Sequence, residues 1–178
     1  GSVRGGSMTI SMHEIAVPSF QKHLAALDAI LDKAVAYCEA KKIEPETLLT
    51  ARLYPDMYPF KKQVTSACDF AKLSVARLAG LTAPVHDDTE TTFGELKTRI
   101  AETLAVIAEA RPEPMETAAD REVKIKAGPR ELTFTGREYL LHFALPNFYF
   151  HCATVYGILR HNGLEIGKRD FMRRMPPV

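Results

Sequence analysis

The stretch that decides the fold is YLLHFALPNFYFHCATVYGIL, from Tyr139 to Leu159. It contains no Asp, Glu, Lys or Arg in 21 residues, and a helix of that length could cross a membrane. Its uncharged polar groups, however, would be costly in hydrocarbon, and a helix that is apolar nearly all round also occurs at the centre of a helical bundle. We therefore predict a buried helix over residues 146–161, preceded by a short helix over residues 136–145, and no membrane span.

Three further long helices are predicted from apolar residues that recur three or four positions apart. The first covers Pro18–Lys42 and the second covers Pro59–Leu78. The third begins after Thr92, which has Glu95 three residues on in the pattern of a capping box, and it ends before Pro112. The polar linker between the second and third helices is long enough to permit a crossover connection.

Between the third and fourth helices the apolar spacing changes from helical to alternating. Residues 112–120, rich in proline and acidic residues, are expected to form a loop. The sequence beyond it predicts a β-hairpin that turns at Ala127–Arg130 and packs on the helices, because two strands alone are marginally stable. The predicted fold is mainly α, a four-helix bundle with a small β-hairpin insertion between the third and fourth helices. The alternating apolar residues are Val123, Ile125, Leu132 and Phe134.

Composition excludes some classes of partner. Lys plus Arg is 23 and Asp plus Glu is 22, so the net charge is +1, which argues against a nucleic-acid binder or a membrane anchor that works through charge. Three widely spaced cysteines form no metal or disulfide motif, which favours reduced thiols in the cytoplasm. We interpret residues 1–7, which precede Met8, as a remnant of expression and residues 8–178 as one domain.

Candidate functional residues lie on the fourth helix. Asn147 and His151 are four residues apart and Thr154 follows one turn later, so all three share one side of a helix that we expect to be buried. Buried polar groups need partners, and Gln63 or Asp69 on the second helix could supply them. Three readings stay open: an internal hydrogen-bond network that fixes helix register, a small-molecule pocket, and a transition-metal site, for which amides are poor ligands.

A second candidate group is the aromatic loop before the second helix. Its residues Tyr54, Asp56 and Tyr58 lead into the helix that carries Gln63. The loop could therefore line the mouth of a pocket beside His151, or it could simply cover the end of the bundle. Common catalytic motifs, among them GxGxxG, the Walker A sequence, HExxH and GxSxG, are absent from the sequence.

Longer motifs resemble a known family. The segments LPNFYFH (145–151), TVYGILRHNG (154–163) and GKRDF (167–171) are similar to the DUF1993 family, as is DMYPF (56–60) with Gln63 and ACD (67–69). The resemblance covers almost the whole chain. This family looks like a branch of the DinB/YfiT-like superfamily, and the resemblance implies a four-helix bundle that is commonly dimeric.

The resemblance also implies a position for a metal site. In that superfamily three histidines typically hold a divalent metal, one on the second helix and an HxxxH pair on the fourth. The matching positions here are Gln63, Asn147 and His151, so one histidine of the three is kept. Superfamily members with known activity include thiol-dependent S-transferases and isomerases, although kinship of fold does not transfer an activity.

We therefore predict a cytoplasmic, homodimeric bundle protein that binds a small polar molecule, without a tightly held metal, in a pocket lined by Gln63, Asn147 and His151. His151 would be the general acid or base of any catalysis, as the group expected to titrate near neutral pH. The alternatives are a metal-dependent transferase of the DinB type, with the metal on the same three residues, and a non-catalytic interaction or stress-associated protein.

Overall fold

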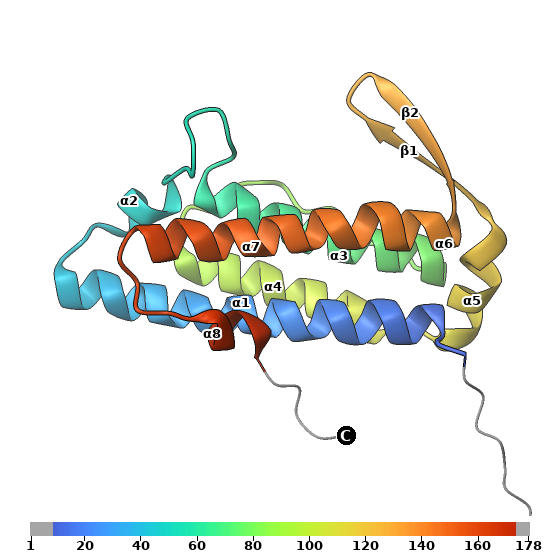
Figure 1. The fold of residues 1–178 in the computed structure, drawn as a ribbon, viewed down its shortest axis with the longest axis horizontal. Coiled ribbons are helices and arrows are strands. Elements are labelled where there is room, and N and C mark those ends of the chain that lie inside the picture. Colours follow the sequence, from blue (N-terminus) through green and yellow to red (C-terminus); the bar gives the residue numbers. More distant parts are fainter. Residues whose placement is uncertain (1–8, 174–178) are drawn as a thin grey trace, which may run out of the picture.

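The structure is a computed structural model that describes residues 9–173, so the expected remnant over residues 1–7 lies outside the described part. Four long helices form a bundle with a short hairpin projecting from one end (Figure 1). This arrangement confirms the mainly helical fold with its hairpin insertion. The long helices are α1 (Met12–Lys41), α3 (Phe60–Ala79), α4 (Phe93–Ala108) and α7 (Leu145–His161), and the short ones include α2 (Pro45–Leu49) and α8 (Lys168–Met172).

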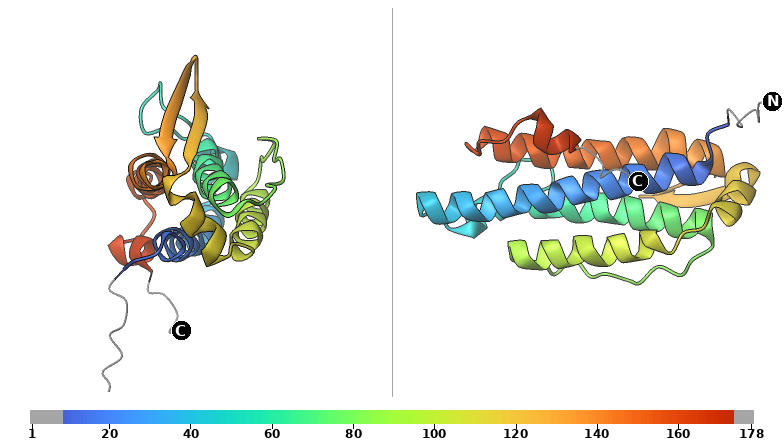
Figure 2. Two further views of the ribbon diagram at one scale, coloured as in Figure 1. Left: turned by 90° about the vertical axis from the view of Figure 1, so that its right-hand side faces the viewer. Right: turned by 90° about the horizontal axis from the view of Figure 1, so that it is seen from below.

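The long helices pack around one core. Helix α3 lies between α7 and α4, and α4 also packs on α1, whose outer side is covered by α8 (Figure 2). Phe20 of α1 and Phe148 of α7 are both fully buried and meet edge to face, with ring centroids 4.8 Å apart. No helix within residues 9–173 has the length and apolar character needed to cross a membrane.

Helices α3 and α4 run in the same direction, because the segment that joins them returns along the length of the bundle (Figure 2). This crossover strap, residues 81–91, is held by buried cations. Arg99 of α4, 2% exposed, pairs with Asp88 at 2.8 Å and Glu90 at 2.9 Å. Lys72 of α3 donates a hydrogen bond to the carbonyl of Pro84 at 2.8 Å. The permitted crossover is thus present, and charge pairs fix it.

Two predicted boundaries are wrong. Helix α1 begins at Met12, six residues before Pro18, because Ser11 caps it by accepting a hydrogen bond from the amide of Glu14. Pro18 lacks the N–H that would reach the carbonyl of Glu14, so the helix forgoes one bond there and continues. The expected loop over residues 112–120 is helical too: it forms α5 (Pro112–Thr117) and the 3-10 turn η1 (Ala118–Asp120). A proline suits the first turn of a helix, where an N–H has no intrahelical partner.

The hairpin joins β1 (Glu122–Ala127) to β2 (Arg130–Thr135) in antiparallel register, with Val123 opposite Phe134 and Ile125 opposite Leu132. Gly128 has a φ of 62°, which a two-residue turn beginning with glycine requires. The apolar face of the hairpin is turned toward the helices, since Val123 and Ile125 are buried and Phe134 contacts Phe143 with centroids 5.5 Å apart. The hairpin therefore packs on the bundle, as predicted.

The short helix and the fourth helix are continuous rather than separate. Helix α6 (Gly136–Tyr139) passes through the π-helical segment η2 (Leu140–Ala144) into α7. In η2 the amide of Leu145 donates to the carbonyl of Leu140, five residues back. The wide turn immediately precedes Pro146, whose ring would clash with the carbonyl of His142 in a regular α-helix. The helix thus accommodates the proline without breaking.

Candidate functional site

Gln63 and His151 meet across the interface of α3 and α7. The side-chain oxygen Oε1 of Gln63 lies 2.6 Å from Nδ1 of His151, and both residues are buried. The amide nitrogen Nε2 of Gln63 donates to the backbone carbonyl of Tyr58 at 3.2 Å, and a carbonyl can only accept. That bond orients the amide, so Oε1 must accept from Nδ1–H of His151. The proton of the neutral imidazole is therefore on Nδ1, and Nε2 carries a lone pair.

Burial determines the charge of His151. The residue is 8% exposed, and aromatic rings of Phe70 and Tyr58 lie nearly parallel to it with centroids 5.6 and 6.4 Å away. Loss of solvation, assisted by the charge of Lys62, lowers the pKa of His151 from 6.5 to about 4. The expectation that His151 titrates near neutral pH is therefore wrong. At pH 7 its ring is therefore neutral, and the lone pair on Nε2 is able to accept a hydrogen bond.

Asn147 does not join the Gln63–His151 pair. Its Nδ2 donates to the carbonyl of Phe143 at 2.8 Å, one helical turn back. Thr154 likewise donates to its own helix, at the carbonyl of Phe150, because a short polar side chain easily reaches the preceding turn. The expected polar cluster therefore divides: His151 forms the hydrogen bond between helices, while Asn147 and Thr154 bond within their own helix.

Asp69 does not contact the polar residues of α7 that its sequence position suggested as partners. Its carboxylate pairs with the buried Arg99 of α4 at 2.8 Å and lies 3.7 Å from Lys72. It belongs to the charge cluster that also holds the crossover strap. Sequence reasoning missed Arg99, because a single arginine within an amphipathic helix gives no sign that it will be buried among three carboxylates from α3 and the crossover strap.

The aromatic loop contributes one of its three candidate residues to the His151 environment. Tyr58 lies against His151, as described above, although its side chain is half-exposed. Tyr54 is 65% exposed and Asp56 is also exposed, and no contact links either to His151. Arg52 holds the loop by donating to the carbonyl of Met57 at 2.7 Å. The loop thus covers the end of the bundle and presents Tyr58 to the site.

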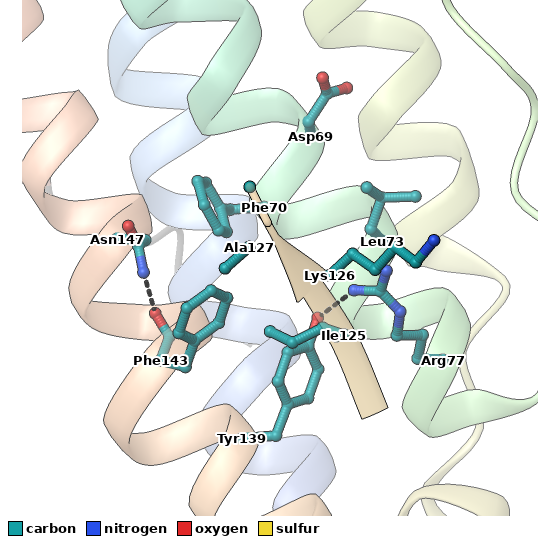
Figure 3. Close-up of a pocket in the computed structure, with 11 residues that line it drawn as sticks. Asp69, Phe70, Leu73, Arg77, Ile125, Lys126, Ala127, Tyr139, Phe143 and Asn147 are labelled. Atoms are coloured by element: carbon teal, nitrogen blue, oxygen red, sulfur yellow. Dashed lines mark hydrogen bonds between the residues drawn. The ribbon is translucent and has the colours of Figure 1, made fainter. Parts of the chain in front are cut away.

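A cavity of about 470 Å³ lies between α3, the hairpin and the helix that contains η2 (Figure 3). Its walls are mostly apolar, with a few polar groups at the margins. Phe70 connects it to the histidine, because this ring lines the cavity and also stacks on His151. The lining residues are Asp69, Phe70, Leu73, Arg77, Ile125, Lys126, Ala127, Gly128, Tyr139, Phe143 and Asn147.

The π-helical turn aligns the residues that face this cavity. Tyr139, Phe143 and Asn147 are spaced at intervals of four, and His151 continues the series. In a regular α-helix such a series drifts by about 40° per step around the axis. The wide turn of η2 holds about one additional residue, which offsets most of the drift. The helix therefore presents an aligned row of side chains to α3 and the hairpin.

Sequence reasoning missed the hairpin side of the cavity. Arg77 of α3 donates to the hydroxyl of Tyr139 at 2.7 Å and lies over that ring, 5.6 Å from its centroid (Figure 3). Ile125 and Lys126 of β1 complete this side. Alternating residues predicted the strands, but no local pattern shows onto which helix a hairpin folds, so these residues carried no signal in the sequence.

The residues at the implied metal positions do not fit a three-histidine site. Oε1 of Gln63 is bonded to His151, and the amide of Asn147 is bonded to its own helix. Amides are also weak ligands for zinc or nickel. Within residues 9–173 no group of three His, Cys, Asp or Glu side chains is placed to hold a metal ion. These three positions therefore do not support a metal-dependent step.

Comparisons with known proteins agree with this fold. A family model described as "Domain of unknown function (DUF1993)" matches residues 12–172. The crystal structure of a DinB family member protein from Shewanella denitrificans is similar at a TM-score of 0.84, with 43% sequence identity over 94% of each chain. No curated protein matches the sequence.

Proposed function

This chain belongs to the DUF1993 family and has the fold of a DinB family member, and on that premise we propose that it binds a small polar molecule in the cavity beside His151. The observation that carries the proposal is the cavity itself. Its volume, apolar walls and few converging polar groups are typical of small-molecule sites. Asn147 supplies one polar group directly.

His151 has a defined part in this proposal. It is neutral at pH 7, its Nδ1–H is engaged by Gln63, and within the described residues no side chain or carbonyl is hydrogen-bonded to its Nε2. The ring supports Phe70, which forms part of the cavity wall. Nε2 would accept a hydrogen bond from a ligand group that reaches past Phe70. A pKa near 4 suits an acceptor or a weak base, and no tightly bound metal takes part.

A screen of small fragments by ligand-observed NMR tests the proposal. Leu73→Trp would place an indole at the cavity from a helix position that is 38% exposed, so the fold should tolerate it. The matched control is Val85→Trp, which adds the same ring to the crossover strap at a position that is 91% exposed. Fragments should bind to the wild type and the control and be lost in Leu73→Trp. Binding that Leu73→Trp leaves unchanged, or no binding at all, would contradict the proposal.

The proposal includes a homodimer in the cytoplasm. Cys38, Cys68 and Cys152 are free and buried, which suits a reducing compartment. Phe150 and Tyr58 are both about half exposed and both contact His151, so an apolar patch surrounds the histidine. Such a patch favours contact with a second copy. Sedimentation equilibrium should give a dimer that Phe150→Ser weakens, and a monomeric wild type would exclude it.

A further inference from the structure

We propose that the ligand of this cavity is an organic anion, a carboxylate or a phosphate monoester on a flat apolar body. This inference rests on the proposed function and specifies the chemical class of its ligand. Two features carry it: cations at the cavity that have no carboxylate partner, and a wall of aromatic rings next to them.

The charges around the cavity are not balanced. Arg77 and Lys126 both line it, and within residues 9–173 neither forms an ion pair with a carboxylate. The single carboxylate of the lining is Asp69, which already pairs with Arg99 at 2.8 Å and lies 3.7 Å from Lys72. An anionic ligand would therefore meet two cations that form no ion pair among the described residues. Asp69 is neutralised by other residues, and Glu131, which lies opposite Lys126 in the hairpin register, does not line the cavity.

Arg77 is oriented before any ligand binds. One of its N–H groups donates to the hydroxyl of Tyr139, and its guanidinium lies over the tyrosine ring. These two contacts restrict the long side chain, which reduces the entropy lost when a ligand is bound. A guanidinium has five N–H donors in a planar fork. The remaining donors can therefore bind two oxygens of one carboxylate or phosphate group.

The wall beside Arg77 suits a flat apolar body. Tyr139 and Phe143 lie nearly parallel, with centroids 6.0 Å apart, and Phe70 meets Phe143 at 5.9 Å. Ile125 of the hairpin and Leu73 of α3 extend this apolar surface. Aromatic side chains favour offset stacking or edge contacts with other rings. The cavity volume of about 470 Å³ accommodates a two-ring molecule.

Paired probes test the charge requirement by isothermal titration calorimetry. Naphthalene-2-carboxylate and naphthalene-2-carboxamide have the same shape and differ in charge. The wild type should bind the carboxylate about tenfold more tightly, as one partly exposed charge contact allows, and added salt should reduce this preference. In Arg77→Gln most of the preference should disappear, because Lys126 then remains as the only cation of the lining, and Arg77→Lys should keep more of it.

Lys124→Gln is the matched control, because Lys124 lies on the same strand and the same face as Lys126 but does not line the cavity. It should keep the wild-type preference, whereas Lys126→Gln should reduce it. Circular dichroism confirms that each variant is folded. A third probe, 2-naphthyl phosphate, shows which head group the site prefers, and tighter binding of either anion supports the inference.

The experiments distinguish a failure of the anion class from a failure of the proposed function. If fragments bind in the cavity but carboxylate and carboxamide bind equally, or if neither naphthyl probe binds, the anion class is wrong and the proposed function stands. If the naphthyl probes and the fragment screen alike give no binding, the proposed function falls as well. If Arg77→Gln keeps the full preference for the carboxylate, the assignment of the anion to Arg77 is overturned.

Discussion

Oε1 of Gln63 accepts the Nδ1 proton of His151 at 2.6 Å, and the backbone carbonyl of Tyr58 fixes the amide in the orientation that allows it. Two parts of the chain that are distant in sequence, residues 58–63 and His151, thus determine which nitrogen of the histidine is free. The tautomer follows from hydrogen bonding, and the charge follows from burial. Each can be measured separately.

The first prediction concerns the titration of His151. Nitrogen-15 NMR should show a proton on Nδ1 and a pKa near 4. Because the folded-state pKa lies below the ordinary value of 6.5, the unfolded chain binds more protons between these two pH values. Stability should therefore fall as the pH drops from 6.5 toward 4, by up to about 3 kcal/mol from this group. A pKa above 6 would contradict the burial argument.

Urea unfolding at several pH values checks this linkage. His151→Gln removes the titrating group, so its stability should decline less steeply between pH 6.5 and 4 than that of the wild type. His142→Gln, at an exposed position in the preceding turns of the same helix, is the control and should keep the wild-type slope. Identical slopes for wild type and His151→Gln would show that His151 does not contribute.

The second prediction is that a single isosteric change raises the pKa of His151. Gln63→Glu places a carboxylate against Nδ1–H, and a negative charge at this distance should raise the pKa of His151 by about 1–3 units. Histidine NMR titration measures the change. Gln21→Glu on α1 adds the same charge without a contact to His151 and should leave its titration where it was. A shift of equal size in both variants would indicate a general charge effect.

The third prediction concerns the buried charge cluster. Arg99→Met leaves Asp69, Asp88 and Glu90 without their shared cation. Because Asp69 and Asp88 are 34% and 41% exposed and keep Lys72 and Lys62, the cost should be about 1–3 kcal/mol. Hydrogen exchange should also accelerate in the crossover strap. Arg137→Met breaks a pair with Asp120 that is exposed on both sides, so it should cost less than about 1 kcal/mol. Equal losses of unfolding free energy in Arg99→Met and Arg137→Met, measured with urea, would contradict this prediction.

The fourth prediction compares two helical glycines. A Cβ at Gly136 would clash with the backbone carbonyl of Ala118, so Gly136→Ala should destabilise the protein and loosen the contact between η1 and α6. At Gly157 a Cβ meets nothing within 4 Å, so Gly157→Ala should stabilise α7 by about 0.5–1 kcal/mol. Thermal unfolding measures both, and opposite signs are expected. Stabilisation by Gly136→Ala would show that the approach to Ala118 is not tight.

The fifth prediction concerns metal. Protein purified without a nickel column should contain far less than one equivalent of zinc or nickel, and adding either ion should leave the melting temperature unchanged. The reason is that Gln63 and Asn147 use their amides in hydrogen bonds where a metal site needs strong donors. One bound equivalent by elemental analysis, with a higher melting temperature, would restore the metal-dependent alternative.

The fold was largely predictable because its signals are local. Phe60 and Val64 lie on a helical stripe, and Val123 and Ile125 alternate, so each element follows from its own residues. The pairing of Gln63 with His151 was also predictable, since both are polar residues on helices expected to face each other. The predicted start of α1 at Pro18 was wrong, because Ser11 caps the helix upstream and the helix continues through the proline.

The remaining features depend on tertiary packing. The row from Tyr139 to Asn147 aligns only because of the π-helical turn, and the cavity exists only because the hairpin folds back over Arg77. The neutral state of His151 follows from the rings placed around it, which no spacing along the chain reveals. These features of the site depend on contacts between distant segments, so the local sequence does not predict them.

The segment η2 is equivalent to a single inserted residue that the helix absorbs without breaking. Removing one residue from it, such as the part-exposed Leu141, would return the segment to regular α-helical winding, and the loss of the residue and the loss of the wide turn would nearly cancel. Tyr139 would then keep its orientation toward Arg77. A deletion in the regular part of the helix would instead rotate the preceding segment by about 100° around the axis and turn the hairpin away from α3. The wide turn is therefore a point at which the chain can change its length by one residue without moving the hairpin.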